Sequence, residues 1–201
     1  MPAIILLAAG ASSRLGQPKQ LLPFEGKSLL RRAAETAIHA DLGPVVVVTG
    51  ALHEELLPEL AGLQVAITRN ESWERGMGAS IKAGLRAAEA LAPLTGVLIM
   101  LCDQPLITSD LLRALQQKQL TANCPIVATE YAEIQGVPAL FGKEVIPLLR
   151  SMSDEAGARQ LLRQHPNKVA TVPFSAASLD VDTPAQYEQL LQQAKGTFPG
   201  C

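Results

Sequence analysis

The chain has 201 residues, of which 48% are hydrophobic and 18% are charged, and its formal net charge is −2. This composition is typical of a globular protein and predicts a single domain over residues 1–201. Neither the charge nor the aromatic content of 3% favours nucleic acid as a partner, because binding it needs a basic face or bases stacked on aromatic rings.

The first predicted element is a buried parallel strand over residues 3–9, which is apolar throughout. It is too short for a signal peptide or a membrane span. The three cysteines lie far apart without a Cys-x-x-Cys motif, so neither a disulfide framework nor a zinc site is expected. We therefore expect a cytoplasmic protein with no membrane partner.

A loop of small and basic residues follows this strand. Gly10 can take a positive φ and lets backbone N–H groups approach an anion, and Ser12 and Ser13 add short donors. Arg14 and Lys19 add positive charge. The spacing fits neither a Walker loop nor the Gly-x-Gly-x-x-Gly fingerprint of dinucleotide-binding proteins. The loop predicts a phosphate site of another kind.

Alternating helices and strands come next. Ser28 is expected to cap a helix over residues 29–39, and the pattern then predicts a strand over 44–49, a helix over 52–60 and a strand over 64–68. Such alternation predicts a doubly wound α/β sheet, with ligands in the crevice at the carboxyl ends of its strands.

The loop over residues 70–80 also follows a strand, and it leads into a helix that ends near Leu91. The amide of Asn70 and the backbone at Gly76 could contact a nucleobase or a ribose. Alternatively, the Gly and Ser residues of this loop only cap the helix.

Asp103 is a candidate metal ligand, because it comes directly after the apolar strand predicted over residues 97–101. A carboxylate at the carboxyl end of a central strand could hold Mg²⁺, although it could also cap the turn before Pro105.

The rest of the chain predicts a helix over 110–120, strands over 124–131 and 135–141, helices over 143–150 and 155–164, a strand over 169–173 and a final helix to about 194. Before that last helix, Asp180 and Asp182 alternate by two, so both carboxylates point to one side of an extended chain. One of them could complete the cation site; an N-cap is the other interpretation.

Residues 7–19, which read Leu-Ala-Ala-Gly-x-Ser-x-Arg-Leu-Gly-x-x-Lys, resemble the signature of the MobA-like nucleotidyltransferases, and among them the molybdenum cofactor cytidylyltransferases. Segments around Asn70, Asp103 and Asp182 are similar to further motifs of that family, in the expected order. The resemblance implies a single-domain Rossmann-like, mostly parallel sheet of the nucleotide-diphospho-sugar transferase type.

The resemblance also implies roles for individual residues. Catalysis would depend on Arg14, Lys19 and Asp103, and Mg²⁺ would be held by Asp103 and Asp182. The Gly-x-Pro segment at residues 136–138 would line a second-substrate pocket, although it could equally be a crossover between strands. The nucleotide would be bound by Leu7, Ala8, Ala9, Gly10, Ser12, Arg14, Lys19, Asn70, Gly76 and Ser80.

One further segment departs from the family pattern. Residues 154–159 are similar to its Gly-Asp-x-Gly-Ala-Arg motif, but Asp154 stands where Gly is usual and Glu155 where Asp is usual. The role of Arg159 toward an anionic second substrate is therefore left open.

The activity that the resemblance implies is transfer of CMP from CTP to molybdopterin carrying molybdenum, with release of pyrophosphate. The product would be the cytosine dinucleotide cofactor of molybdoenzymes of the xanthine dehydrogenase type. Ala9 is like the cytidylyl branch, since the guanylyl branch tends to have Gly there. The alternatives are a guanylyltransferase using GTP, a nucleotidyltransferase with another phosphorylated acceptor, and a non-catalytic cofactor carrier.

Overall fold

The protein is described here by a computed structural model that covers residues 1–11 and 15–196. A seven-stranded sheet runs through its centre in the order β5-β4-β1-β6-β8-β7-β9. Among the described strands of this sheet, β8 alone runs antiparallel to its neighbours. The mostly parallel sheet expected from the sequence is thus confirmed. The strands are β1 (Ala3–Leu7), β4 (Val45–Thr49), β5 (Ala66–Arg69), β6 (Gly96–Leu101), β7 (Ile126–Tyr131), β8 (Ile134–Gly142) and β9 (Val169–Pro173).

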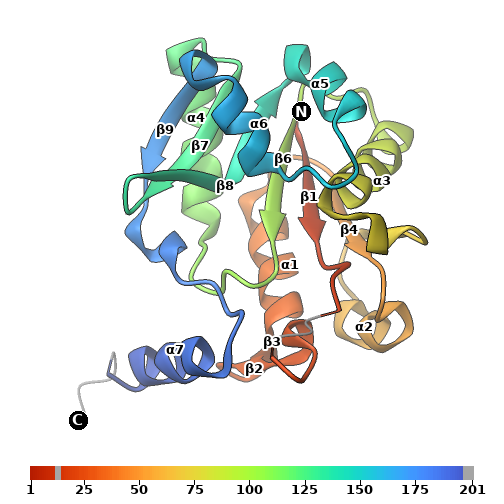
Figure 1. The fold of residues 1–201 in the computed structure, drawn as a ribbon, viewed down its shortest axis with the longest axis vertical. Coiled ribbons are helices and arrows are strands. Elements are labelled where there is room, and N and C mark those ends of the chain that lie inside the picture. The colour runs from red at the N-terminus through yellow and green to blue at the C-terminus, as the bar shows by residue number, and fades with distance from the viewer. Residues whose placement is uncertain (12–14, 197–201) are drawn as a thin grey trace.

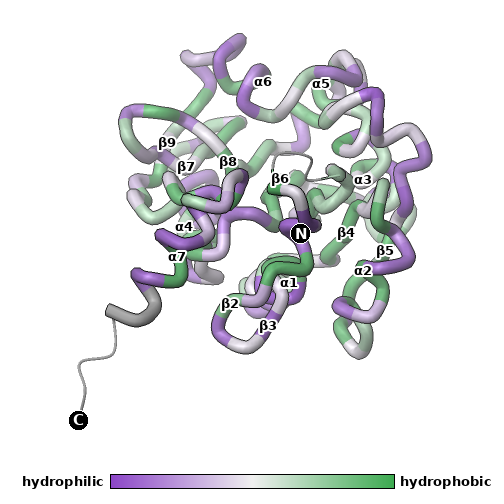
Figure 2. Tube along the Cα trace, turned by 60° about the horizontal axis from the view of Figure 1, so that its bottom comes forward, coloured by the Kyte–Doolittle hydropathy of each residue, from purple (hydrophilic) through white to green (hydrophobic). Residues whose placement is uncertain are grey.

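Helices cover both faces of the sheet (Figure 1). α1 (Leu29–Ala40), α2 (His53–Leu60) and α4 (Ser109–Ala122) pack on one face, against a cluster that includes Ile4 and Leu6. On the other face, α3 (Met77–Leu91), α5 (Ile146–Ser151) and α6 (Ala158–Gln164) pack against a cluster that includes Ile5 and Leu7. Since side chains alternate along a strand, one short apolar run serves both cores. Figure 2 shows hydrophobic residues along the central strands and hydrophilic residues mostly toward the outside.

A third, smaller cluster lies below the carboxyl ends of the strands. It joins the hairpin of β2 (Pro23–Phe24) and β3 (Lys27–Ser28) to α7 (Pro184–Gly196), with Phe24, Val181 and Leu190 buried in it. The Tyr187 hydroxyl donates a hydrogen bond to the carbonyl oxygen of Pro23 at 2.6 Å. The chain's last helix is therefore attached to a segment near its start.

Most helix boundaries follow the sequence pattern. Ser28 caps α1, with its hydroxyl accepting a hydrogen bond from the N–H of Arg31. α4 begins at Ser109, one residue earlier than expected, and its cap is Thr108, whose hydroxyl accepts from the N–H of Leu111. Helix α6 begins at Ala158, three residues later than expected, because residues 153–157 pack against the start of α3. Within the described residues, no helix combines the length and apolar character needed to cross a membrane.

Candidate active site

The site lies where two neighbouring parallel strands end. β1 and β6 pair in register, Leu7 with Leu101, so the chain leaves both strands at the same edge of the sheet. After β1 come the residues that lead to Gly10, and after β6 comes Asp103. This is the edge at which open α/β sheets bind ligands.

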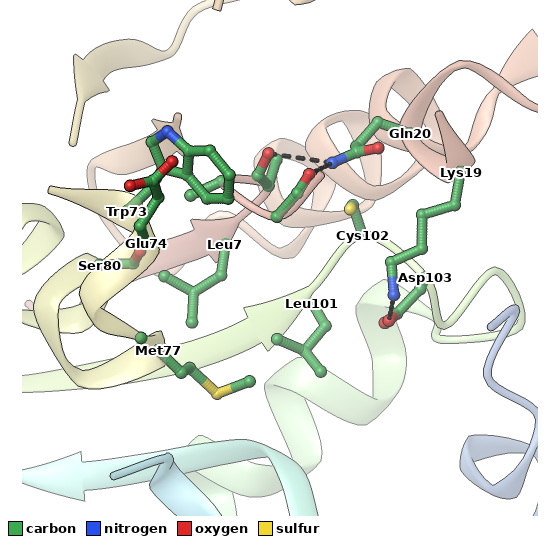
Figure 3. A pocket seen from close by; sticks show the side chains of 14 residues that line it. Leu7, Lys19, Gln20, Trp73, Glu74, Met77, Ser80, Leu101, Cys102 and Asp103 are labelled. Carbon is green, nitrogen blue, oxygen red and sulfur yellow. Dashed lines mark hydrogen bonds and ion pairs between the residues drawn. The ribbon is translucent and has the colours of Figure 1, made fainter. Parts of the chain in front are cut away.

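Lys19 lies between two carboxylates that come from distant parts of the chain. Its Nζ is 2.6 Å from Asp103 Oδ2 and 2.6 Å from Asp182 Oδ1. The C-terminal segment is held here by its backbone, because the N–H of Val181 donates to the carbonyl oxygen of Asp103 at 2.9 Å. Figure 3 shows Lys19 reaching toward Asp103 across the mouth of a cavity. The structure thus brings together the basic loop and the two predicted acids.

Asp103 is the buried member of this group, with 7% of its surface exposed. Burial raises the pKa of its carboxyl above the usual range, and Lys19 offsets only part of that effect. Burial also acts to lower the pKa of Lys19, but Asp103 and Asp182 outweigh it and raise this pKa. Within the described residues, Asp103 Oδ1 is buried and accepts no hydrogen bond. A buried carboxylate oxygen without a donor fits a site for a cation.

Asp103 and Asp182 provide two carboxylates that could bind a metal ion beside Lys19. In the described parts of the chain, no group of three or more His, Cys, Asp or Glu side chains could hold a metal ion. Two carboxylates suit Mg²⁺, which usually binds one or two carboxylates together with phosphate oxygens and water. Cys102 lies beside them, and burial raises the pKa of its thiol to about 12, so at neutral pH it is a neutral thiol.

A cavity of about 330 Å³ opens next to Lys19 and Asp103. Gln20 shapes the wall that follows β1: its Nε2 donates to the carbonyl oxygens of Ala8, at 3.2 Å, and Gly10, at 2.6 Å (Figure 3). The other walls come from the segment before α3 and from β6. The lining residues are Leu7, Ala8, Ala9, Gly10, Lys19, Gln20, Trp73, Glu74, Gly76, Met77, Ser80, Leu101, Cys102 and Asp103.

The two glycines predicted to contact the nucleotide differ in backbone. Gly76, just before α3, has φ 121° and ψ −177°, a conformation that favours glycine. Gly10 lies outside the left-handed φ range, so the conformational freedom of glycine is not used there. A Cβ on Gly10 would meet nothing within 4 Å, because the position faces open space beside the cavity.

Asn70 lies outside both cavities of the site. Its Nδ2 donates to the hydroxyl of Ser80 at 3.0 Å, and its Oδ1 accepts from the N–H of Ser72 at 3.0 Å. Asn70 is 6% exposed, and its amide joins the loop at Ser72 to Ser80, which lines the cavity.

A second cavity of about 540 Å³ adjoins the first and shares Lys19 and Asp103 with it. Val137, from the predicted second-substrate segment, and Arg159 both line it. The guanidinium of Arg159 donates to the hydroxyl of Tyr131 at 3.0 Å. Asp180 and Asp182 both line this second cavity, which agrees with their expected orientation to one side.

Two predicted site residues, Ser12 and Arg14, lie outside the residues that the structure describes. Conversely, Gln186 was missed by sequence reasoning. Its Oε1 accepts from the N–H groups of Asp182 and Thr183, and its Nε2 donates to Asp180 Oδ1 at 3.2 Å. Its place three residues after Thr183 is the signal of a capping box, which would have indicated this role.

Comparison with known proteins agrees with this arrangement. The family model of the MobA-like NTP transferase domain matches residues 4–169. The chain is 34% identical over 200 residues to the nicotine blue oxidoreductase of Paenarthrobacter nicotinovorans, covering 93% of this chain and 95% of that protein. It is 30% identical over 200 residues to the purine catabolism protein PucB of Bacillus subtilis (92% and 94%). It is 26% identical over 184 residues to the molybdenum cofactor cytidylyltransferase of Escherichia coli (91% and 92%).

Among solved structures, Rv0371c of Mycobacterium tuberculosis in complex with manganese superposes with a TM-score of 0.76 at 25% identity, covering 94% of this chain and 97% of that one. The likeness confirms the expected α/β fold, and it shows that a similar protein binds a divalent metal.

Proposed function

The chain belongs to the MobA-like NTP transferase family, and from that premise we propose that it transfers CMP from CTP to molybdopterin carrying molybdenum. The observation that supports this most directly is the meeting of Lys19 with Asp103 and Asp182, at 2.6 Å each, beside a cavity lined by Leu7–Gly10. A cation and two acids at the mouth of such a cavity suit the binding of a metal–triphosphate.

The proposed reaction is an in-line displacement at phosphorus. An oxygen of the acceptor's terminal phosphate forms a bond to the α-phosphorus of CTP, the bond from that phosphorus to the bridging oxygen breaks, and pyrophosphate leaves. Lys19 neutralises negative charge on the triphosphate, and the backbone after β1 holds the nucleotide. Asp103 and Asp182 would hold Mg²⁺, which supplies Lewis acidity toward the phosphate oxygens. Arg14 is proposed as a second cation on the triphosphate.

The nature of the acceptor is supported by relatives and by the second cavity. The Escherichia coli relative is a molybdenum cofactor cytidylyltransferase, and the Bacillus subtilis relative acts in purine catabolism. Hydroxylation of purines is chemistry of the xanthine dehydrogenase type, so we propose such a molybdoenzyme as the recipient of the product. The second cavity shares Lys19 and Asp103 with the first, so an acceptor phosphate bound there would lie beside the proposed α-phosphate.

Four alternatives compete with this proposal. A guanylyltransferase, a transferase with another phosphorylated acceptor, and a non-catalytic cofactor carrier would use the same cavities. The fourth alternative is an oxidoreductase, as the Paenarthrobacter relative is named. The sequence lacks the Gly-x-Gly-x-x-Gly fingerprint after β1, and the charged groups of the site suit phosphate better than a nicotinamide ring.

One assay separates the cytidylyltransferase from the guanylyltransferase, the carrier and the oxidoreductase. Pure protein is incubated with Mg²⁺, molybdopterin cofactor and each nucleoside triphosphate in turn, and pyrophosphate is measured. We expect release with CTP. Release with GTP alone would select the guanylyl alternative, and binding without release would select the carrier. Oxidation of added NAD(P)H in the presence of nicotine blue would select the oxidoreductase.

Asp103→Asn tests the metal site in the same assay. Because Asp103 is the buried carboxylate between both cavities, we expect turnover to fall by roughly a hundred- to a thousandfold, in the range seen when one preorganised electrostatic group is removed. Asp110→Asn, on the exposed surface of α4, is the matched control. Near-parental turnover of the Asp103→Asn protein would remove Asp103 from the reaction.

A further inference from the structure

The segment between α5 and α6, residues 153–157, lies against the start of α3 (Figure 1). The N–H of Ala79, in the first turn of α3, donates to the carbonyl oxygen of Asp154 at 3.2 Å. A Cβ on Gly76 would come within 2.6 Å of that same oxygen, and one on Gly78 within 2.1 Å of the carbonyl oxygen of Ser153. The two segments therefore touch backbone to backbone, which glycine alone permits.

The Asp154 side chain strengthens this contact with charge. Its Oδ2 is 2.5 Å from Arg75 Nη2, and its Oδ1 pairs with Lys82 Nζ. Lys82 also donates to the carbonyl oxygen of Met152 at 3.1 Å. The Asp154 side chain is 17% exposed and that of Lys82 is 22% exposed, so this pair is better shielded from water than an ordinary surface ion pair. The hydrogen bond from Lys82, followed by the charge of Arg75, lowers the pKa of Asp154, which keeps it ionised at neutral pH.

The two segments that Asp154 joins form walls of different cavities. Gly76 and Ser80 line the cavity proposed for the nucleotide, whereas Gly157 and Arg159 line the second one. Met77 lines both, and a Cβ on Gly157 would lie 3.1 Å from its sulfur. Movement of either wall must therefore disturb the other.

We infer that Asp154 is a positioning residue that fixes the walls of the two cavities against each other, so that binding in one cavity depends on the order of the other. The physical basis is conformational entropy. A ligand that orders one wall also orders part of the other wall, so a second ligand loses less conformational entropy when it binds there. Asp154 stands where the similar family motif usually has Gly. The identity of the two ligands rests on the proposed function, but the docking of the two segments does not.

The docking is tested first in the protein without ligands, by hydrogen exchange with mass spectrometry. In Asp154→Ala we expect peptides over residues 75–80 to exchange at least about tenfold faster than in the parent, because local opening is easier once the ion pairs are gone. Peptides over β1 should not change. The control is Glu89→Gln, which removes the pair between Arg150 and Glu89, another link between α5 and α3. Unchanged exchange at residues 75–80 in Asp154→Ala would overturn the inference.

The consequence for binding is tested by calorimetry with a non-hydrolysable CTP analogue and Mg²⁺. We expect Asp154→Ala to bind the analogue about tenfold more weakly, a loss typical of coupled sites, and Asp154→Glu to recover most of the affinity because it keeps the charge. In turnover, KM for the acceptor should rise more than kcat falls. Faster exchange with unchanged affinity and KM would overturn the positioning role. If the parent binds no nucleoside triphosphate, the proposed function fails, and the exchange experiment still decides the docking.

Discussion

At the scale of single residues, Lys19 is the centre of the site. Its ammonium lies between Asp103 and Asp182, the two carboxylates that we propose as ligands of Mg²⁺. A triphosphate bound in the first cavity would offer Lys19 other anionic oxygens, and the two carboxylates would then be available to a metal ion. Nucleotide and metal should therefore favour each other's binding.

Lys19→Met tests this role without any assay of turnover. Removing the ammonium leaves Asp103 and Asp182 facing each other, and we expect the free energy of unfolding to fall by about 2 kcal/mol, less than for a fully buried pair because Asp182 is 38% exposed. Millimolar Mg²⁺ should then raise the Tm of the variant more than that of the parent, since a cation that binds only the folded state stabilises it.

The control for this comparison is Lys27→Met, which removes a more exposed lysine from its pair with Glu35. Its response to Mg²⁺ should equal that of the parent. An equal rise in Tm for Lys19→Met and the parent would show that Lys19 does not compete with a divalent cation.

At the scale of elements, the site depends on how closely α3 approaches the sheet. Gly84 faces β1 and β4, and a Cβ there would lie 2.6 Å from Ile5 Cγ2 and 2.8 Å from Val48 Cγ2. This contact lets the first turn of α3, with Gly76 before it and Ser80 within it, reach the carboxyl end of β1. A helix without this glycine would stand farther from the sheet.

Gly84→Ala is expected to lower the free energy of unfolding by about 1–2 kcal/mol. Overpacking against the sheet costs roughly 1–3 kcal/mol, and the better helix propensity of alanine, worth about 1 kcal/mol, offsets part of it. Urea unfolding measures the difference. Gly10→Ala is the control, because a Cβ there meets nothing within 4 Å, and its stability should change by less than about 0.5 kcal/mol. A Gly84→Ala protein as stable as the parent would show that α3 can move outward at no cost.

At the scale of the whole molecule, the candidate site depends on contacts between segments that are far apart in the sequence. α7 packs on the β2–β3 hairpin through a cluster that includes Leu190, and the segment before α7 presents Asp182 to Lys19. Gln186 fixes that segment by accepting from the N–H groups of Asp182 and Thr183. The position of one acid therefore depends on the packing of a helix that lies outside the main sheet layers (Figure 1).

Leu190→Ala should report this dependence. The side chain is fully buried, so we expect a loss of about 2–4 kcal/mol in the free energy of unfolding. Mn²⁺ binding in the presence of CTP, followed by electron paramagnetic resonance, should weaken by roughly tenfold, as when a partner of a metal ligand is disturbed. Gln189→Ala, at an exposed position of the same helix, should change neither quantity. Loss of stability with full Mn²⁺ affinity would separate α7 from the metal site.

The sequence by itself determined the elements and the chemistry that they carry. The apolar runs within residues 3–9 and 44–49 predict buried parallel strands, and Ser28 marks the start of α1, because these signals depend on neighbours a few residues away. The order of Lys19, Asp103 and Asp182 along the chain also indicated a phosphate and metal site. Tertiary structure alone decided how these residues meet.

Three outcomes had no local signal. Lys19 pairs with Asp182 rather than with Asp180 through a contact between residues 163 positions apart in the sequence. Its contact with Asp103 joins residues 84 positions apart. Asn70 lines neither cavity of the site, and its amide instead donates to Ser80, ten residues later in α3. Asp154 found Lys82 and Arg75 only because the segment after α5 packs on α3. The physical reason is common to all three: a side chain's partner is set by which elements pack together, and packing sums many weak contacts that no short stretch of sequence contains.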